Sequence, residues 1–234
     1  MCGRFTLTQN LRQVEQHFGV KVAQADEYHP TYNAAPTQYL PVITNLQSDT
    51  LQFFRWGLIP HWAKEASMGN KMINARAETL TEKPSFKKLV TQKRCLVISD
   101  GFYEWQSLEG PAQGSLTSRK RKQPYHISLA SNGLFAFAGL WENWIDRNSG
   151  EVIPSFSIIT TEANALVKEV HDRMPVILSH ADEALWLKDS ISESDHLDLL
   201  KPYPAEKMKK YAVGEEVNSP RNNSPDLLHR LNMQ

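Results

Sequence analysis

The order of the apolar runs along the chain constrains the fold more than any other feature of the sequence. Five runs are rich in β-branched and aromatic residues, as strands are: residues 50–60, 93–106, 123–130, 134–145 and 155–163. Stretches with helical spacing stand apart from one another, at residues 7–20, 161–171 and 179–189. Strands and helices therefore do not alternate regularly. This order predicts an α+β fold with a largely antiparallel sheet or barrel and a few flanking helices.

The helical stretches carry boundary signals. The first has Thr8 as its expected N-cap, Gly19 as its stop and three apolar residues on one face: Leu11, Val14 and Phe18. Ser179 is the expected N-cap of the last. Gly, Ser and basic residues fill residues 107–122, which we expect to form a long hairpin loop. Residues 1–234 are expected to form one domain, with an irregular tail from about 220 to 234.

Composition narrows the class of protein. The chain has 234 residues and a net charge of zero, so its overall charge does not attract nucleic acid or an anionic membrane. Its two cysteines, Cys2 and Cys95, are too few for a disulfide framework or a cysteine-rich zinc site. We therefore expect no membrane partner, no cofactor and no metal ligands. The first residues lack the apolar region of a signal peptide, so a cytoplasmic location is expected.

The second residue is chemically unusual. If Met1 is removed, Cys2 carries an α-amine and a thiol on neighbouring carbons, a pair of nucleophiles that no other residue offers. The plainer alternative is that Cys2 belongs to a frayed terminus, since the first residues of a chain are commonly poorly ordered. The rest of the chain decides between the two.

Three further stretches place polar residues where apolar ones are expected. They are NKMINARAET, DGFYEWQ and VHDRMPVIL, and their polar members include Asn74, Arg76, Glu78, Glu104, His171, Asp172 and Arg173. Each has a plain structural explanation when taken singly. Glu104 would face water between two buried aromatic residues, and His171 would complement a helix end. Arg76 and Glu78 would form a surface ion pair.

Taken together, the stretches resemble one family. They run in one order through MCGRF, YNAAPTQ, RWGLIPHWAK, INARAET, RCLVISDGFYEW, FAGLWE, IITTEAN, HDRMPVIL and VNSPRNN. The set covers nearly the whole chain and is similar to the SOS response-associated peptidase (SRAP) family, also called abasic-site processing proteins. The resemblance implies a SRAP-type domain that recognises abasic sites in single-stranded DNA during the DNA damage response. The loop at residues 107–122 is longer than is typical of the family.

The resemblance also implies a use for the second residue. An abasic site is a hemiacetal in equilibrium with an aldehyde, and an amine attacks the aldehyde to give a Schiff base. A neighbouring thiol then closes a five-membered thiazolidine ring. An α-amine has a pKa of about 7.7–8.0, so part of it is neutral and nucleophilic near neutral pH. The protein would thus be a lyase-like enzyme that joins Cys2 covalently to DNA after Met1 is removed.

Further roles follow from the same resemblance. Glu104 would be the general acid and base, His171 would promote opening of the sugar ring, and Asn74 would hold the N-terminus or the bound sugar. Phosphate contacts from arginines and base stacking on a tryptophan would come from Arg4, Arg76, Arg173 and Trp62. A local cluster of arginines would reconcile DNA binding with zero net charge. We expect a monomer with no cofactor, and the sequence names no partner at the replication fork.

Two other functions remain open. N-terminal-nucleophile amidohydrolases also begin Met-Cys-Gly and use the cysteine thiol to attack an amide. Those enzymes typically continue with an apolar residue where this chain has Arg4, which argues against them. The peptidase label of the family adds self-cleavage after Met1 or proteolysis of other proteins. The remaining alternative is a single-strand binder that shields DNA without chemistry.

Overall fold

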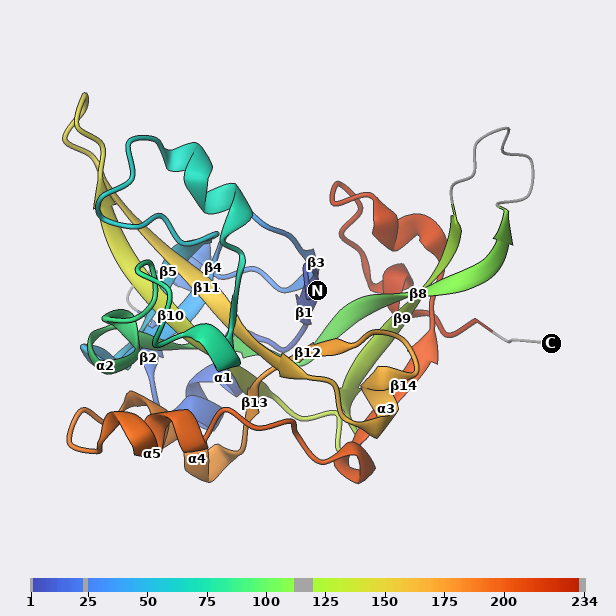
Figure 1. Ribbon diagram of the computed structural model, residues 1–234. Coiled ribbons are helices and arrows are strands. Elements are labelled where there is room, and N and C mark those ends of the chain that lie inside the picture. Colours follow the sequence, from blue (N-terminus) through green and yellow to red (C-terminus); the bar gives the residue numbers. More distant parts are fainter. Residues whose placement is uncertain (1, 23–24, 112–119, 232–234) are drawn as a thin grey trace.

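The computed structural model describes residues 2–22, 25–111 and 120–231. Its strands form a smaller and a larger sheet, which lie on the right and on the left of Figure 1. The smaller sheet is five-stranded and antiparallel, in the order β14 (Met208–Ala212), β9 (Lys120–Leu129), β8 (Gly101–Pro111), β1 (Phe5–Leu7) and β3 (Thr31–Ala34).

The larger sheet contains a closed ring of strands. Its order is β12 (Arg173–Pro175), β11 (Val152–Glu162), β10 (Phe135–Ile145), β7 (Arg94–Ser99), β4 (Tyr39–Thr44), β5 (Gln47–Trp56) and β2 (Lys21–Val22), with β6 (Asn74–Arg76) on β11 and β13 (Ile177–Leu178) on β10. A short parallel contact between β11 and β5 closes the ring, whose other pairings are antiparallel. This arrangement confirms the predicted α+β fold with a largely antiparallel, barrel-like core.

Helices flank the larger sheet. They are α1 (Leu11–Phe18), α2 (Leu89–Gln92), α3 (Ala165–Lys168), α4 (His180–Leu187) and α5 (Glu193–Asp198), and α4 packs on β7 and β10. Ser179 caps α4 and Gly19 ends α1, as predicted. The N-cap of α1 is Asn10, whose side chain accepts from the Gln13 backbone N–H in a capping box, and not Thr8.

Short 3₁₀ helices complete the connections: Ala25–Glu27, Ala66–Lys71, Ala77–Thr79, Ala205–Lys207, Glu215–Asn218 and Pro225–Leu228. The last lies in the tail that was predicted to be irregular, and its Leu227 is buried beside Tyr103 and Val213. Within the predicted hairpin loop at residues 107–122, residues 107–111 and 120–122 are strand, because β8 and β9 pair as far as Pro111 and Lys120. Residues 112–119 lie outside the described residues. No described helix has the length and apolar character needed to span a bilayer.

An aromatic core joins the two sheets and encloses the start of the chain. The ring of Phe5 lies 5.1 Å from that of Trp56 and 5.8 Å from that of Phe137, between centroids, so β1 is clamped against the larger sheet. Cys2 belongs to the same cluster and has no exposed surface. The alternative of a frayed terminus is therefore wrong from Cys2 onwards.

The Asp100-Gly101 turn carries the chain from the larger sheet to the smaller one. A Cβ at Gly101 would lie 2.3 Å from Nε2 of His126, so only glycine fits this close approach. Asp100 accepts hydrogen bonds from the hydroxyls of Thr6, at 2.6 Å, and Thr8, at 2.7 Å. This contact explains why Thr8 does not cap α1. The two strands predicted around the turn exist, but they belong to different sheets.

Candidate active site

Cys2 lies three residues before β1 and is buried in the core. The antiparallel pairing of β1 with β8 continues to a 3.0 Å hydrogen bond from the Tyr103 backbone N–H to the Arg4 carbonyl, so Cys2 runs alongside the next residues of β8. Burial raises the pKa of the Cys2 thiol well above its usual range, and the charge of Glu104 raises it further. The thiol is therefore protonated at neutral pH, and its chemistry requires a nearby base.

Glu104 supplies a buried carboxyl group. Its exposed fraction is 2%, so the alternative in which Glu104 faces water is wrong. Burial raises the pKa of Glu104, while the charge of His171 acts in the opposite direction. Because Glu104 also affects the Cys2 thiol, it is electrostatically coupled to both groups. A carboxyl group with a raised pKa exchanges protons closer to neutral pH.

Asn74 holds the segment that carries Cys2. It begins β6, which pairs in parallel with β11 and places Asn74 opposite Ile158. Its Nδ2 donates a 2.8 Å hydrogen bond to the Cys2 carbonyl oxygen. Its Oδ1 is buried and accepts no hydrogen bond from a described residue. The side chain thus positions the start of the chain and retains one buried acceptor.

His171 follows α3 in the turn that leads to β12. Its Nδ1 accepts from the Arg173 backbone N–H at 3.0 Å and lies 2.8 Å from Oδ1 of Asp172. When Nδ1 accepts, the ring proton is on Nε2; when the ring is doubly protonated, Nδ1–H can donate to Asp172. The turn therefore offers a partner for either protonation state, as a proton-transfer group requires. The structure brings His171, Glu104, Asn74 and Cys2 to one site.

Two of the predicted DNA-contacting arginines have internal partners. Arg173 forms a bidentate pair with Glu78, at 2.7 and 2.9 Å. Arg4 donates to Oδ1 of Asn33 at 2.8 Å and to the Val217 carbonyl at 2.7 Å. Both guanidinium groups hold distant segments of the chain together, and only their remaining N–H groups are available to a ligand.

Arg76 and Trp62 are exposed. Arg76 lies two residues along β6 from Asn74, and its side chain makes no hydrogen bond or ion pair with a described residue. The expected pair of Arg76 with Glu78 is absent because Glu78 is held by Arg173. Trp62 is 45% exposed and lines a hollow of about 330 Å³ together with Lys88 and Lys93. These two side chains lie where a ligand outside the fold can reach them.

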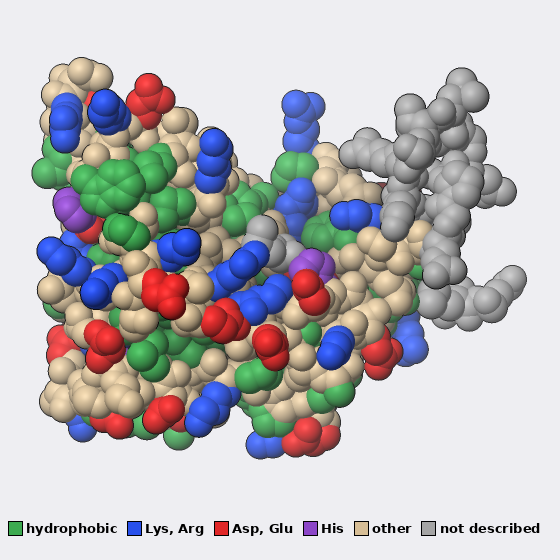
Figure 2. Space-filling view, viewed as in Figure 1, with side chains coloured by type: hydrophobic (Ala, Val, Ile, Leu, Met, Phe, Trp, Pro, Cys, Tyr) green, Lys and Arg blue, Asp and Glu red, His purple; other side chains and the backbone are tan. Residues whose placement is uncertain are grey.

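Basic side chains gather on the face that carries the site. In Figure 2, Lys and Arg side chains surround the hollow between the part of the molecule with the larger sheet and the part with the smaller sheet. Acidic side chains lie mainly lower on the same face. The chain therefore combines zero net charge with a locally basic surface.

Sequence reasoning missed Asn33. Its Oδ1 accepts from Arg4, and its Nδ2 donates to three backbone carbonyls of the C-terminal segment: Val217, Ser219 and Asn222. The same segment accepts at Oδ1 of Asn218 from the indole N–H of Trp105, at 2.6 Å. The stretches YNAAPTQ, which contains Asn33, and VNSPRNN, in the C-terminal segment, both carried the family resemblance. No spacing indicates that residues so far apart meet beside the start of the chain.

The structure also bears on metal binding. In the part of the chain that it describes, the group of His, Cys, Asp or Glu side chains spaced to share a metal ion is His17, His180 and Glu183, on α1 and α4. None of these residues belongs to the site around Cys2.

Comparison with known proteins gives one consistent result. The family model described as SOS response associated peptidase (SRAP) matches residues 1–220. Abasic site processing protein YoqW of Bacillus subtilis (strain 168) is 46% identical over 97% of this chain and 99% of its own length. Abasic site processing protein HMCES of Xenopus tropicalis is 35% identical over 87% of this chain and 67% of its own length. A crystal structure from Bacteroides thetaiotaomicron is 31% identical, covers 98% of this chain and 100% of its own, and superposes with a TM-score of 0.86. The chain therefore belongs to the SRAP family.

Proposed function

We propose that this protein processes abasic sites in single-stranded DNA by joining them covalently to Cys2. The observation that carries the proposal is the convergence of Asn74 and Glu104 on Cys2, one by a hydrogen bond to its carbonyl and the other by its effect on the thiol pKa. The names of relatives that match over nearly the whole chain support the same substrate. Capture of an aldehyde by an aminothiol needs a proton-transfer group beside an N-terminal cysteine, and Glu104 is such a group.

The reaction releases one molecule of water. After removal of Met1, the Cys2 α-amine attacks the open-chain aldehyde to give a carbinolamine. Departure of the carbinolamine hydroxyl as water leaves an iminium ion. The thiol sulfur then bonds to the iminium carbon and the thiol proton leaves, so the product is a neutral thiazolidine. Atoms and charge balance without an oxidant or a reductant.

Each polar residue around Cys2 has a proposed role in the reaction. Glu104 protonates the departing hydroxyl and later accepts the thiol proton, and its raised pKa supports both steps. His171 accepts the proton of the C1′ hydroxyl and returns it to the ring oxygen O4′ as the C1′–O4′ bond breaks and the aldehyde forms. Asn74 holds the Cys2 carbonyl, and its unused Oδ1 accepts a hydrogen bond from the α-amine or a sugar hydroxyl. Positioning these groups around one carbon atom accounts for much of the expected rate.

DNA is proposed to bind across the basic hollow of Figure 2. Arg76 contacts a phosphate beside the lesion, since its guanidinium makes no internal hydrogen bond among the described residues. Trp62 stacks on an unpaired base. Arg4 and Arg173 keep their internal partners and reach phosphates with their remaining N–H groups.

Intact mass spectrometry tests the proposal. Protein incubated with a single-stranded oligonucleotide carrying one abasic site should gain the mass of the oligonucleotide less one water, and should lack Met1. An undamaged oligonucleotide of the same sequence is the control. Cys2→Ala should give no adduct, and Cys2→Ser should give a less heat-stable one, because oxygen closes a less durable ring. Protein that retains Met1 and still forms the stable adduct would contradict the mechanism.

The alternatives predict different outcomes in the same preparation. An N-terminal-nucleophile amidohydrolase would release ammonia from glutamine and form no adduct with abasic DNA. A peptidase would cleave a peptide substrate in a manner that depends on Cys2. A binder without chemistry would protect single-stranded DNA equally well as wild type and as Cys2→Ala.

A further inference from the structure

We propose that His17, His180 and Glu183 form a binding site for a divalent transition-metal ion of the zinc type. His17 lies in the last turn of α1, and the other two lie on α4. The proposal is independent of the chemistry at Cys2, because none of the three residues belongs to that site.

The three side chains already face one another. One potential ligand atom from each lies within 4.8 Å of the others. Nδ1 of His180 is 3.0 Å from Oε2 of Glu183, and Nε2 of His17 is 3.9 Å from Oε1. Bonds of about 2.0–2.2 Å in a tetrahedral zinc site place ligand atoms roughly 3.3–3.6 Å apart. Small side-chain rotations therefore suffice to close the set around an ion.

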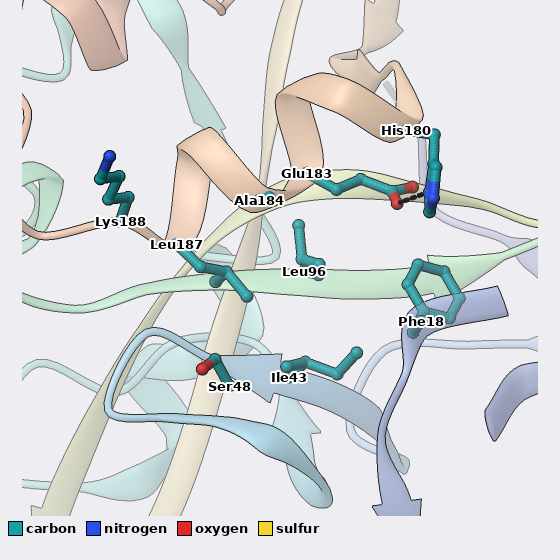
Figure 3. A pocket seen from close by; sticks show the side chains of 9 residues that line it. All are labelled: Phe18, Ile43, Ser48, Leu96, His180, Glu183, Ala184, Leu187 and Lys188. Carbon is teal, nitrogen blue, oxygen red and sulfur yellow. Dashed lines mark hydrogen bonds and ion pairs between the residues drawn. The ribbon is translucent and has the colours of Figure 1, made fainter. Parts of the chain in front are cut away.

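Helix geometry explains why these residues meet. His180 directly follows the N-cap Ser179, and Glu183 comes three residues later, so both lie on one face of α4. Figure 3 shows the side chains of His180 and Glu183 pointing toward each other, close to Phe18 of α1. The imidazole rings of His17 and His180 lie 5.1 Å apart, between centroids. Two helices far apart in sequence thus supply one compact donor set.

Charge and hydrogen bonding both favour a cation here. Glu183 is 4% exposed, and the ion-pair partners of its carboxylate among the described residues are the two imidazoles. A buried carboxylate costs free energy unless it is paired, and a metal ion held by the same three side chains would pair with it. Nε2 of His17 is buried and has no hydrogen-bond partner among the described residues. Coordination of a metal ion by its lone pair would satisfy this atom. Lys188 lines the same cavity but lies at its other end in Figure 3.

The donor types and the surrounding space indicate the class of ion. Two imidazoles and one carboxylate suit zinc and neighbouring transition metals better than magnesium or calcium, which prefer oxygen ligands. The site opens into a cavity of about 440 Å³, and the His180 side chain is 75% exposed, so an ion has a path from solvent. A fourth coordination position remains for water or a small anion. An ion bound here would connect α1, which follows β1, to α4.

Direct metal titration tests the site. Full-length protein freed of metal with a chelator is titrated with Zn²⁺ by calorimetry and with Co²⁺ by visible absorbance. One equivalent should bind, and thermal unfolding should shift upward by several degrees when Zn²⁺ is present. His17→Gln and His180→Gln should each weaken binding at least tenfold and remove the thermal shift. His229→Gln is the matched control, because His229 is an exposed histidine near Asp226 elsewhere in the chain.

Metal binding by the variants distinguishes the proposed site from binding elsewhere on the protein. Cys2 is another potential ligand for zinc, so Cys2→Ser is titrated in parallel and should bind the metal as wild type does. Loss of binding in both histidine variants, with normal unfolding transitions without metal, supports the site. Failure to bind either metal, loss only in Cys2→Ser, or loss in just one histidine variant overturns the three-ligand site.

Discussion

The side-chain amide of Asn74 donates a 2.8 Å hydrogen bond to the backbone carbonyl of Cys2. This bond connects β6, on the larger sheet, to the segment that leads into β1 of the smaller sheet. The position of Cys2 therefore depends on how the two sheets pack and not on local conformation alone.

Asn74→Asp should slow adduct formation because it replaces the donor with a carboxylate next to a carbonyl oxygen. The lost hydrogen bond costs about 1 kcal/mol of positioning energy, and the added charge increases the loss. Single-turnover rates with abasic single-stranded DNA measure the effect. Asn148→Asp, at an exposed position in the turn after β10, is the control. Equal rates for the two variants would show that Asn74 does not position Cys2.

Glu104→Gln should slow crosslinking by about 10²–10⁴, the usual contribution of a general acid or base. The side chain keeps its size, so noncovalent affinity for DNA should be unchanged. Crosslinking rates measured against pH test the proton-transfer role, because the raised pKa of Glu104 should appear as an inflection that the variant lacks. Glu151→Gln, on the exposed turn between β10 and β11, is the matched control. An unchanged rate would remove Glu104 from the mechanism.

Arg76→Ala should weaken DNA binding and reduce the slope of log affinity against log salt by about one unit, as expected for one lost phosphate contact. The fold should be unaffected because the Arg76 side chain is exposed and makes no hydrogen bond among the described residues. Fluorescence anisotropy over a salt series with Cys2→Ala protein measures the noncovalent step. Arg147→Ala, on the turn between β10 and β11, should leave the slope unchanged. Identical slopes for both variants would assign Arg76 no phosphate contact.

Protein stability should fall between about pH 6.5 and pH 4 because of His126. Burial lowers the pKa of His126 to about 4, and the charge of Lys209 lowers it further. In this window the unfolded chain binds a proton that the folded chain refuses, so stability rises with pH, by up to about 3 kcal/mol in total. Urea unfolding at several pH values measures the slope. His126→Gln should flatten it, and His229→Gln should not; equal slopes in all three proteins would exclude His126.

The sequence was most informative where periodicity and local signals act. The strands, the C-terminal end of α1, the N-terminal end of α4 and the α+β class follow from apolar runs, Gly19 and Ser179, because these signals are local. The ring closure between β11 and β5 and the separation of β7 and β8 into two sheets depend on contacts between distant residues. Propensity does not contain that information.

In the candidate active site, too, the residue types could be predicted but their contacts could not. Cys2, Asn74, Glu104 and His171 were identified through the family resemblance, and no spacing predicted that they would meet. The internal partners of Arg4 and Arg173 were not predicted, because a surface arginine and a bridging arginine look alike in sequence. The cluster of His17, His180 and Glu183 was missed for a similar reason, since its members come from two helices that meet only in the folded chain.

The antiparallel register of β1 against β8 fixes how many residues can precede Phe5 if Cys2 is to reach the site. Counting back from Phe5, which lies opposite Phe102, each residue advances about 3.3 Å and reverses its side-chain direction. One residue inserted between Gly3 and Arg4 would therefore displace Cys2 and turn its thiol away from Glu104. Affinity tags belong at the other end of the protein, because a leader at the start that is not fully removed would shift or cover the nucleophile even in a perfectly folded molecule.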